Sequence, residues 1–212
     1  MRTLVLVPES PTLQPQIRER FWAGLEAMFY KNMYTLDLRT DKRPADRPIR
    51  THEDRCVALA AIRQAMVDEY LTYELHSHVL WLDADIVDFP VDLPARLLEV
   101  NPAAIVAPAV CIDGNPLRFY DTAGFVENNQ RCRHDQPWFD QPGPVVPLES
   151  VGACYIVPAV VYWAGARHVY SPPFTDHMSV CRRARELDIP VLCDTRITVF
   201  HADLTRYGLA WH

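Results

Sequence analysis

The sequence predicts one α/β domain with a mostly parallel central sheet of Rossmann-like character, flanked by helices. The chain has 212 residues, the usual size of a single domain of this class. Residues 4–7 and 79–82 are almost continuously apolar, as strands are when both faces of a parallel sheet are covered. The segments between them carry apolar residues at helical spacing. We therefore expect residues 1–212 to form a single domain.

The first half of the chain, residues 1–110, alternates strands and helices. The helix after the first strand is predicted to turn four residues towards the core: Ile17, Phe21, Leu25 and Met28. The next expected elements are a strand over 34–38, a helix over 52–73 capped by Thr51, the strand over 79–82, an element of unassigned type over 95–100 and a strand over 104–110. Because a β-α-β opening leaves a nucleotide-sized crevice above it, we expect this half to bind a nucleotide.

The second half, residues 111–212, is expected to bind an acceptor. Tyr120 and Trp138 stand beside carboxylates in a segment with little apolar periodicity. Such aromatic side chains suit stacking on sugars or bases, and they pack equally well as a local core. The elements expected after this segment are a strand beginning within 150–157, a short helix over 159–164, a helix over 172–187, and strands over 190–193 and 197–200, with His201 after the last.

Composition excludes several classes of protein. The net charge is −6 and no dense basic run occurs, so a large nucleic-acid surface is not expected. Six cysteines are scattered singly without zinc-type spacing, which predicts reduced, buried thiols. No signal peptide and no apolar stretch of membrane-spanning length is visible, so we expect a cytoplasmic protein without a membrane span.

Two aspartates, Asp83 and Asp85, end the most apolar strand and indicate where the chemistry occurs. Open α/β sheets bind their ligands beyond the carboxyl ends of the strands. Residues two apart on an extended chain point the same way, so both carboxylates are predicted to face one point. Paired oxygen ligands suit Mn²⁺ or Mg²⁺ carrying phosphate oxygens. An acidic turn that caps the following helix would explain one aspartate but not both.

These motifs together resemble the GT-A class of nucleotide-sugar-dependent glycosyltransferases. The likeness is greatest to the fungal mannan mannosyltransferases of glycosyltransferase family 62, whose Trp-x-Leu-Trp-Leu-Asp-Ala-Asp pattern is similar to residues 79–85 here. Their arginine-bearing helix before that strand is similar to the segment with Arg55 and Arg63. Their Val-Gly-Gly strand start is similar to residues 151–153. The acidic helix start at Asp176 is nearer to family 2.

The resemblance implies a role for each of these positions. Asp83, Asp85 and His201 would hold Mn²⁺ or Mg²⁺, and Asp83 could instead hold ribose hydroxyls. Asp176 would be the general base of an inverting enzyme, although an ordinary helix cap explains it equally well. The implied nucleotide-sugar site consists of Pro8, Glu9, Arg55, Arg63, Asp83, Ala84 and Gly152. The implied acceptor site consists of Tyr120, Trp138, Asp176 and His177.

The expected function is a metal-dependent transfer of a sugar from a nucleotide-diphosphate sugar to an acceptor hydroxyl. That acceptor could be a glycan, a lipid-linked sugar, a protein or a hydroxymethylated DNA base. One rival is a metal-dependent nucleotidyltransferase, which usually carries a phosphate-binding loop rich in Gly, Lys or Arg near its N-terminus. Residues 7–11 are not such a loop. The other rival is a non-catalytic sugar-binding module built on the aromatic segment.

Overall fold

The computed structural model describes residues 2–10, 13–33, 35–41, 51–113, 118–136 and 145–203. Trp138 lies outside this part of the chain. The described residues form a mixed α/β domain around one large sheet, with the strand order β2-β1-β3-β9-β5-β10-β4 and with β8 paired to β10. The strands are β1 (Arg2–Pro8), β2 (Leu36–Asp41), β3 (His76–Leu82), β4 (Ile86–Asp88), β5 (Ile105–Ile112), β8 (Val145–Pro147), β9 (Cys154–Pro158) and β10 (Val191–His201). A separate hairpin pairs β6 (Val126–Glu127) with β7 (Gln130–Arg131).

The sheet is mostly parallel, as the sequence predicts. Strands β2, β1, β3, β5 and β10 run in one direction, and β9 and β4 run in the opposite direction. The antiparallel β9 lies between β3 and β5 and joins the two parallel parts of the sheet. As a result, β3 and β10 end at the same edge of the sheet, where Asp83 follows one strand and His201 ends the other.

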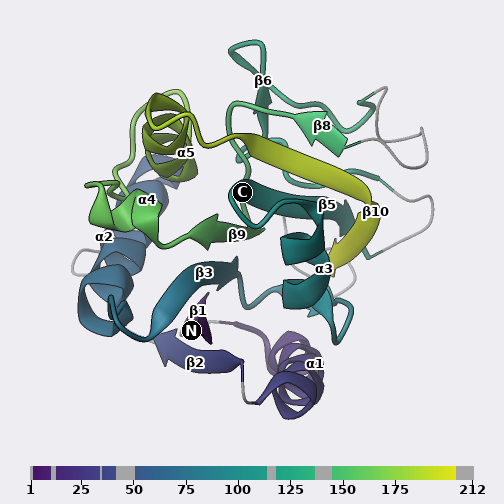
Figure 1. Ribbon diagram of the computed structural model, residues 1–212. Helices are drawn as coiled ribbons and strands as arrows, with labels where there is room; N and C mark the ends of the chain where they lie inside the picture. The colour runs from purple at the N-terminus through teal and green to yellow at the C-terminus, as the bar shows by residue number, and fades with distance from the viewer. Residues whose placement is uncertain are drawn as a thin grey trace.

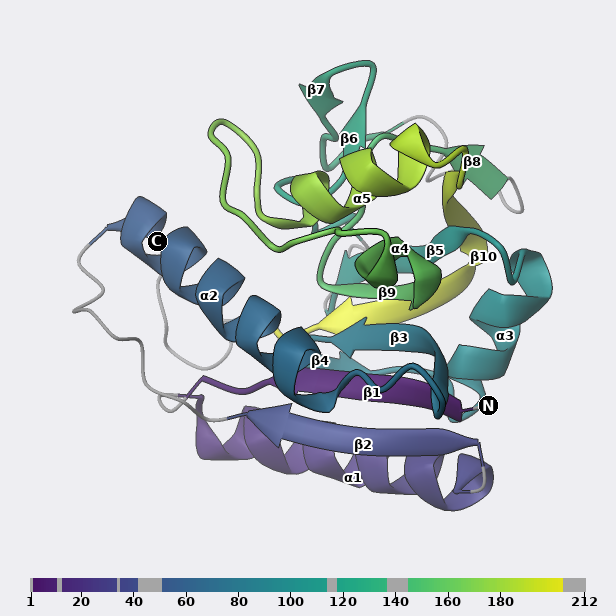
Figure 2. The ribbon, with the colours of Figure 1, turned by 60° about the vertical axis from the view of Figure 1, so that its left-hand side comes forward.

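Helices cover both faces of the sheet. They are α1 (Pro15–Asn32), α2 (His52–Tyr70), α3 (Leu93–Val100), α4 (Val160–Trp163) and α5 (His177–Glu186). In Figure 1, α1 and α3 lie on one side of the sheet, and α2, α4 and α5 lie on the other. Figure 2 shows α1 running alongside β2 at one end of the sheet, with α5 towards the other end. None of the helices in the described part of the chain is long and apolar enough to cross a membrane.

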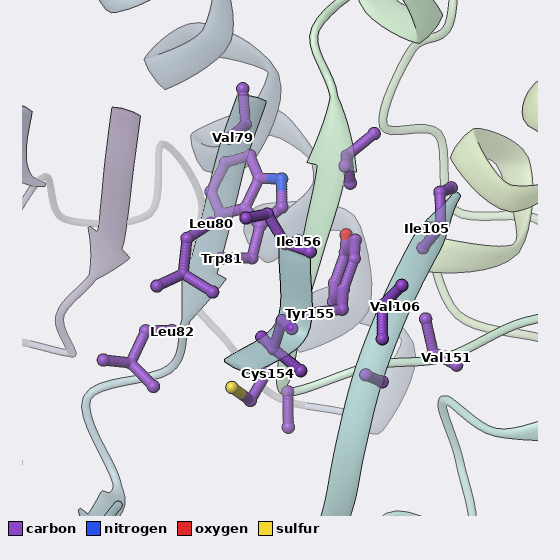
Figure 3. Packing of buried hydrophobic residues seen from close by; sticks show 14 of the residues in the cluster. Val79, Leu80, Trp81, Leu82, Ile105, Val106, Val151, Cys154, Tyr155 and Ile156 are labelled. Atoms are coloured by element: carbon purple, nitrogen blue, oxygen red, sulfur yellow. The ribbon is translucent and has the colours of Figure 1, made fainter. Parts of the chain in front are cut away.

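The central strands are apolar because both of their faces are covered. Every residue of β5 and of β9 is buried, and so are the last four residues of β3. Figure 3 shows the side chains of Trp81, Tyr155 and Val106 among those gathered where these three strands meet. The six cysteines are free and buried, as expected from their spacing.

The helices confirm one predicted face and correct another. In α1 the four predicted residues are the buried ones. Helix α2 begins with the predicted cap, because Thr51 Oγ1 accepts a hydrogen bond from the Asp54 N–H while the Asp54 carboxylate accepts one from the Thr51 N–H. Its buried face, however, contains Cys56, Ala60, Arg63, Met66 and Val67. The apolar spacing of the sequence predicts a different face, with Cys56, Leu59, Ile62, Met66 and Tyr70. Only Cys56 and Met66 are common to both faces, because Arg63 points inward.

The last part of the chain is more regular than the sequence indicates. The two strands predicted over 190–193 and 197–200 are one strand, β10, whose pairing with β5 shifts register between Asp194 and Thr198. Within this strand, Arg196 folds back onto the Asp194 carboxylate, with Nη2 2.6 Å from Oδ2. The short strands β4 and β8 and the β6–β7 hairpin were not predicted.

Candidate functional site

The turn after β3 holds the backbone of the two aspartates in place. The Asp83 N–H donates to the Ala153 carbonyl at 2.9 Å, and the Ile86 N–H donates to the Asp83 carbonyl at 3.0 Å. The Ala202 N–H donates to the Asp85 carbonyl at 2.8 Å. These bonds tie the turn to the start of β9 and to the end of β10. The two carboxylates are consequently fixed where three strands meet.

Asp85 contacts His201, as the sequence predicts from their topology. His201 Nε2 lies 3.0 Å from Asp85 Oδ2. The His201 Nδ1–H donates to the Ala202 carbonyl at 2.8 Å, which turns Nε2 towards the aspartate. The Tyr120 ring stacks on the imidazole, with the ring centroids 3.7 Å apart. His201 is therefore oriented on both of its sides, in the way protein histidines are oriented when they bind metals.

The donor atoms of Asp85 and His201 fit a divalent cation. Asp85 Oδ1 is buried and has no hydrogen-bond partner. Two ligands in adjacent positions of an octahedron with bonds of about 2.1 Å are about 3 Å apart, which matches the 3.0 Å between Nε2 and Oδ2. A carboxylate and an imidazole together suit first-row divalent metals. Burial alone would raise the pKa of Asp85, but the adjacent His201 outweighs burial and lowers that pKa.

Asp83 has a different partner, which corrects the expectation that both carboxylates converge on one point. Arg63 Nη2 donates to Asp83 Oδ1 and Oδ2 at 2.8 and 3.0 Å. Burial raises the pKa of Asp83, and Arg63 opposes this rise. The turn after β3 breaks the extended geometry on which the prediction rested. The two carboxylates therefore diverge, Asp83 towards α2 and Asp85 towards the end of β10.

Arg63 is a buried residue between two carboxylates, not an exposed phosphate ligand. Its Nη1 donates to Asp176 Oδ1 and Oδ2 at 3.0 and 3.3 Å, while Nη2 binds Asp83. The Arg63 side chain is 3% exposed. A buried guanidinium is stable only when carboxylates surround it, which explains why Arg63 faces inward from α2. Arg55, in contrast, is exposed on the first turns of the same helix.

Asp176 belongs to a hydrogen-bonded chain inside the protein. It precedes α5 as predicted, yet its side chain makes no capping bond. The His168 Nδ1–H donates to Asp176 Oδ2 at 2.9 Å, and His168 Nε2 accepts from the Tyr162 hydroxyl at 3.1 Å. The Trp81 indole N–H donates to that hydroxyl at 2.7 Å. The hydrogen-bonded chain thus runs from Trp81 through to Arg63 and Asp83, although Arg63 Nε is buried without a hydrogen-bond partner.

This environment is unsuitable for the general base that the resemblance implies. Burial disfavours the charge of Asp176, but Arg63, His177 and His168 outweigh burial and hold the pKa of this carboxyl well below its usual range. The residue is only 2% exposed. A carboxylate with a strongly lowered pKa is a weak proton acceptor, because the best base has a pKa near the working pH. The structure therefore gives Asp176 a role in holding Arg63.

His168, Asp176 and His177 form the only cluster of potential metal ligands that the described residues bring within 4.8 Å of one another. His177 Nδ1 lies 3.0 Å from the Tyr155 hydroxyl, and burial, aided by Arg63, lowers the pKa of His177 to about 3. Burial also lowers the pKa of His168. The positive charge that this cluster holds is Arg63 itself, and a second cation beside a buried guanidinium would be repelled. Asp85 and His201 lie outside this cluster, and no guanidinium is paired with either of them among the described contacts.

The remaining predicted residues are Pro8, Glu9, Ala84 and Gly152. Pro8 ends β1 and Glu9 follows it, but the Glu9 carboxylate is turned away to Arg18, 2.6 Å from its Nε. Ala84 is buried between the two aspartates. Gly152 comes just before β9, and a Cβ placed there would lie 2.6 Å from Asp121 Oδ2 and 3.0 Å from His177 Cδ2. Glycine is required at this position because no side chain fits.

Two residues of the site were not predicted. Ala153 has φ of 51°, a conformation that alanine rarely adopts, and its carbonyl holds the Asp83 N–H. Asp121 is 8% exposed and accepts a hydrogen bond at Oδ1 from the Gly124 N–H at 2.8 Å, whereas its buried Oδ2 has no hydrogen-bond partner. In the sequence, Asp121 stands beside Tyr120 in the aromatic segment. The Tyr120 ring was assigned to the acceptor site, and the neighbouring carboxylate was not.

The fold is that of GT-A-type nucleotide-sugar transferases. A structure of GalNAc-T7 with UDP, GalNAc and Mn²⁺ matches with a TM-score of 0.52 and 11% identity, covering 95% of this chain and 43% of that one. The catalytic domain of Drosophila β1,4-galactosyltransferase 7 with xylobiose matches with a TM-score of 0.51 and 10% identity, covering 99% of this chain and 74% of that one. This chain thus spans less than half of the GalNAc-T7 structure.

A third similar structure is a 4-diphosphocytidyl-2C-methyl-D-erythritol synthase, with a TM-score of 0.46 and 14% identity over 92% of this chain and 89% of that one. No protein-family model matches the sequence, and no curated protein matches it. The narrower resemblance to the family 62 mannosyltransferases finds no support in these comparisons.

Proposed function

We propose that this protein transfers a sugar from a nucleotide-diphosphate sugar to an acceptor hydroxyl, with Mn²⁺ or Mg²⁺ as cofactor. The observation that carries the proposal is the pair formed by Asp85 after β3 and His201 at the end of β10. Their donor atoms are 3.0 Å apart, and Asp85 Oδ1 is buried without a partner. A carboxylate and an oriented imidazole at the carboxyl edge of an α/β sheet form a suitable site for a cation with phosphate oxygens.

Each residue of the site has a separate task in this proposal. Asp85 and His201 hold the cation, which when bound neutralises the charge that develops on the leaving diphosphate. Asp83, held by two hydrogen bonds from Arg63, keeps lone pairs for hydroxyl groups of the donor. Arg55 is exposed on α2, and its charge helps to lower the pKa of Asp85, which supports a role for Arg55 in binding the phosphates of the donor.

The surrounding residues shape the binding site. The backbone of Pro8 and Glu9 at the end of β1 flanks the nucleotide base, and Gly152 allows the start of β9 to approach the donor. Tyr120 stacks on His201 and so places an aromatic ring beside the cation site, where the acceptor would enter. His177 is neutral because burial lowers its pKa to about 3, and it stands next to Gly152.

The test is a release assay with purified protein, Mn²⁺, and a panel of UDP- and GDP-sugars without added acceptor. Water then serves as a slow acceptor, and the proposal predicts release of a nucleoside diphosphate that stops in EDTA. In a parallel incubation with nucleoside triphosphates and a sugar phosphate, a nucleotidyltransferase would release pyrophosphate. A binding module would retain the nucleotide sugar unchanged. Either of these outcomes would refute the proposal.

A further inference from the structure

The site contains four buried or partly buried carboxyl groups, and three of them are already held by an arginine or histidine side chain. Asp83 is held by Arg63, Asp85 faces His201, and Asp176 is bound by both Arg63 and His168. Asp176, which the sequence suggested as the proton acceptor, is therefore unsuited to that role. The fourth carboxyl is Asp121, which the sequence did not assign.

Asp121 lies within the site, beside residues that already have a role there. A Cβ at Gly152 would be 2.6 Å from Asp121 Oδ2, so this oxygen touches the start of β9. The preceding residue, Tyr120, stacks on His201. The charges of Asp83, His201 and Arg63 are all near enough to influence the ionisation of Asp121. The carboxyl is thus close to the metal-binding pair without an ion pair to either of its members among the described contacts.

The surroundings of Asp121 leave one oxygen uncommitted. Oδ1 accepts the Gly124 N–H at 2.8 Å, which fixes the carboxyl plane. Oδ2 is buried and without a partner. An unpaired polar atom inside a protein costs free energy, and proteins retain such atoms mainly where a ligand or a reaction needs them. The two glycines reinforce this interpretation, because a Cβ at Gly124 would also lie 2.9 Å from both oxygens of Asp121.

We propose that Asp121 is the proton acceptor for the attacking hydroxyl, in place of Asp176. This inference rests on the proposed function and names a further catalytic residue for it. Asp121 Oδ2 takes the hydroxyl proton while the hydroxyl oxygen forms a bond to the anomeric carbon of the donor sugar. The bond from that carbon to the diphosphate oxygen breaks, and its electron pair leaves with the nucleoside diphosphate. The reaction inverts the configuration at the anomeric carbon.

The protonation behaviour of the two candidates agrees with this choice. Burial raises the pKa of Asp121 to about 6, against the Gly124 hydrogen bond and the charges of His201 and Arg63, which act in the opposite direction. Burial is outweighed at Asp176, whose pKa falls well below its usual range. When environments move the pKa values of neighbouring carboxyls apart, the group with a pKa near the working pH is the better acid or base.

The test compares Asp121→Asn with the wild-type protein in the acceptor-free release assay, with water as the attacking hydroxyl. Asparagine keeps the bond from Gly124 but cannot take up a proton. We expect turnover to fall by roughly 10²- to 10⁴-fold, the usual contribution of a general base. Calorimetry with Mn²⁺ and UDP or GDP should give unchanged affinity. Asp135→Asn is the matched control, since that carboxylate lies in the same segment and is 70% exposed.

The outcomes separate the two proposals. Normal turnover in Asp121→Asn would overturn this inference and leave the proposed function intact. Equal loss of nucleotide affinity and turnover would also overturn it, because Asp121 would then serve binding. A wild-type protein that releases no nucleoside diphosphate would refute the proposed function itself. The pH profile gives a second readout: the acidic limb of wild-type turnover should disappear in the residual activity of Asp121→Asn.

Discussion

At the scale of single residues, Arg63 joins two aspartates of the candidate site, Asp83 and Asp176. A guanidinium placed in the interior needs nearby carboxylates, and Arg63 has one from the turn after β3 and one from the start of α5. These residues are far apart in the sequence, so their pairing was not visible from spacing. Because Arg63 binds both carboxylates, a substitution at Asp176 should also shift Asp83, which is proposed to bind the donor.

Replacing Asp176 with asparagine tests whether this residue is an anchor or a base. The change leaves a buried guanidinium with one carboxylate fewer, and we expect it to lower the free energy of unfolding by about 3–5 kcal/mol. Urea unfolding measures the loss. Asp68→Asn is the control, because its ion pair with Arg167 is exposed and should contribute less than about 1 kcal/mol. Unchanged stability with greatly reduced turnover would restore Asp176 as the base.

The buried neutral His177 predicts how stability depends on pH. Burial lowers its pKa from 6.5 to about 3 in the folded protein. The unfolded chain therefore binds a proton between these values that the folded chain does not, and stability falls as the pH decreases through 6.5. We expect wild-type protein to lose about 2 kcal/mol more than His177→Gln between pH 7 and pH 5. Parallel losses in the two proteins, measured by urea unfolding, would contradict the neutral assignment.

At the scale of elements, the backbone just before β9 packs closely against the side chain of Asp121 and the backbone of Asp83. Gly152 leaves no room for a side chain, and the adjacent Ala153 adopts φ of 51° so that its carbonyl meets the Asp83 N–H. Both residues precede a strand that is buried along its whole length. Rigid placement of this segment therefore determines where Asp83 lies.

A methyl group at Gly152 should disturb this segment more than one elsewhere. In Gly152→Ala the new Cβ would lie 2.6 Å from Asp121 Oδ2, so the backbone or the carboxyl must move. We expect a loss of about 1–3 kcal/mol in unfolding free energy, the usual cost of overpacking, together with weaker donor binding. Gly24→Ala in α1 is the control, since the atoms nearest to its new methyl belong to the Phe89 side chain, at 3.2 Å and beyond, and alanine favours the helix. Equal effects in both variants would disprove the close-approach role.

At the scale of the whole molecule, the sequence predicted the strands and helices of the fold better than the contacts of the candidate site. The apolar runs at β1, β3 and β5 and the helical spacing in α1 follow from burial on a covered sheet, and these elements were found as expected. The proximity of Asp85 and His201 also followed from topology, because parallel strands end at one edge. The inward turn of Arg63, by contrast, depends on partners from β3 and α5 that no local pattern reveals.

Residues 118–136 also make contacts that no local sequence pattern predicts. The sequence indicated a segment of aromatic and acidic side chains, and the structure places Tyr120 on His201 and Asp121 against Gly152. Neither contact is a matter of periodicity, since each joins residues distant along the chain. Tertiary packing alone distinguishes Asp83 and Asp176, whose carboxylates are held by Arg63, from Asp121, whose Oδ2 is buried without a hydrogen-bond partner.

The central claim is that Asp85 and His201 hold a cation that binds a nucleoside diphosphate, and calorimetry tests it most directly. UDP and GDP are titrated into wild-type protein with Mn²⁺ and again with EDTA, and the titrations are repeated with Asp85→Asn. Asp92→Asn, a partly exposed aspartate paired with Arg96 on α3, is the control. We predict affinity at least about 10-fold higher with Mn²⁺ in the wild type and in the control, and no metal dependence in Asp85→Asn. Equal affinity with and without metal in the wild-type protein would contradict the account.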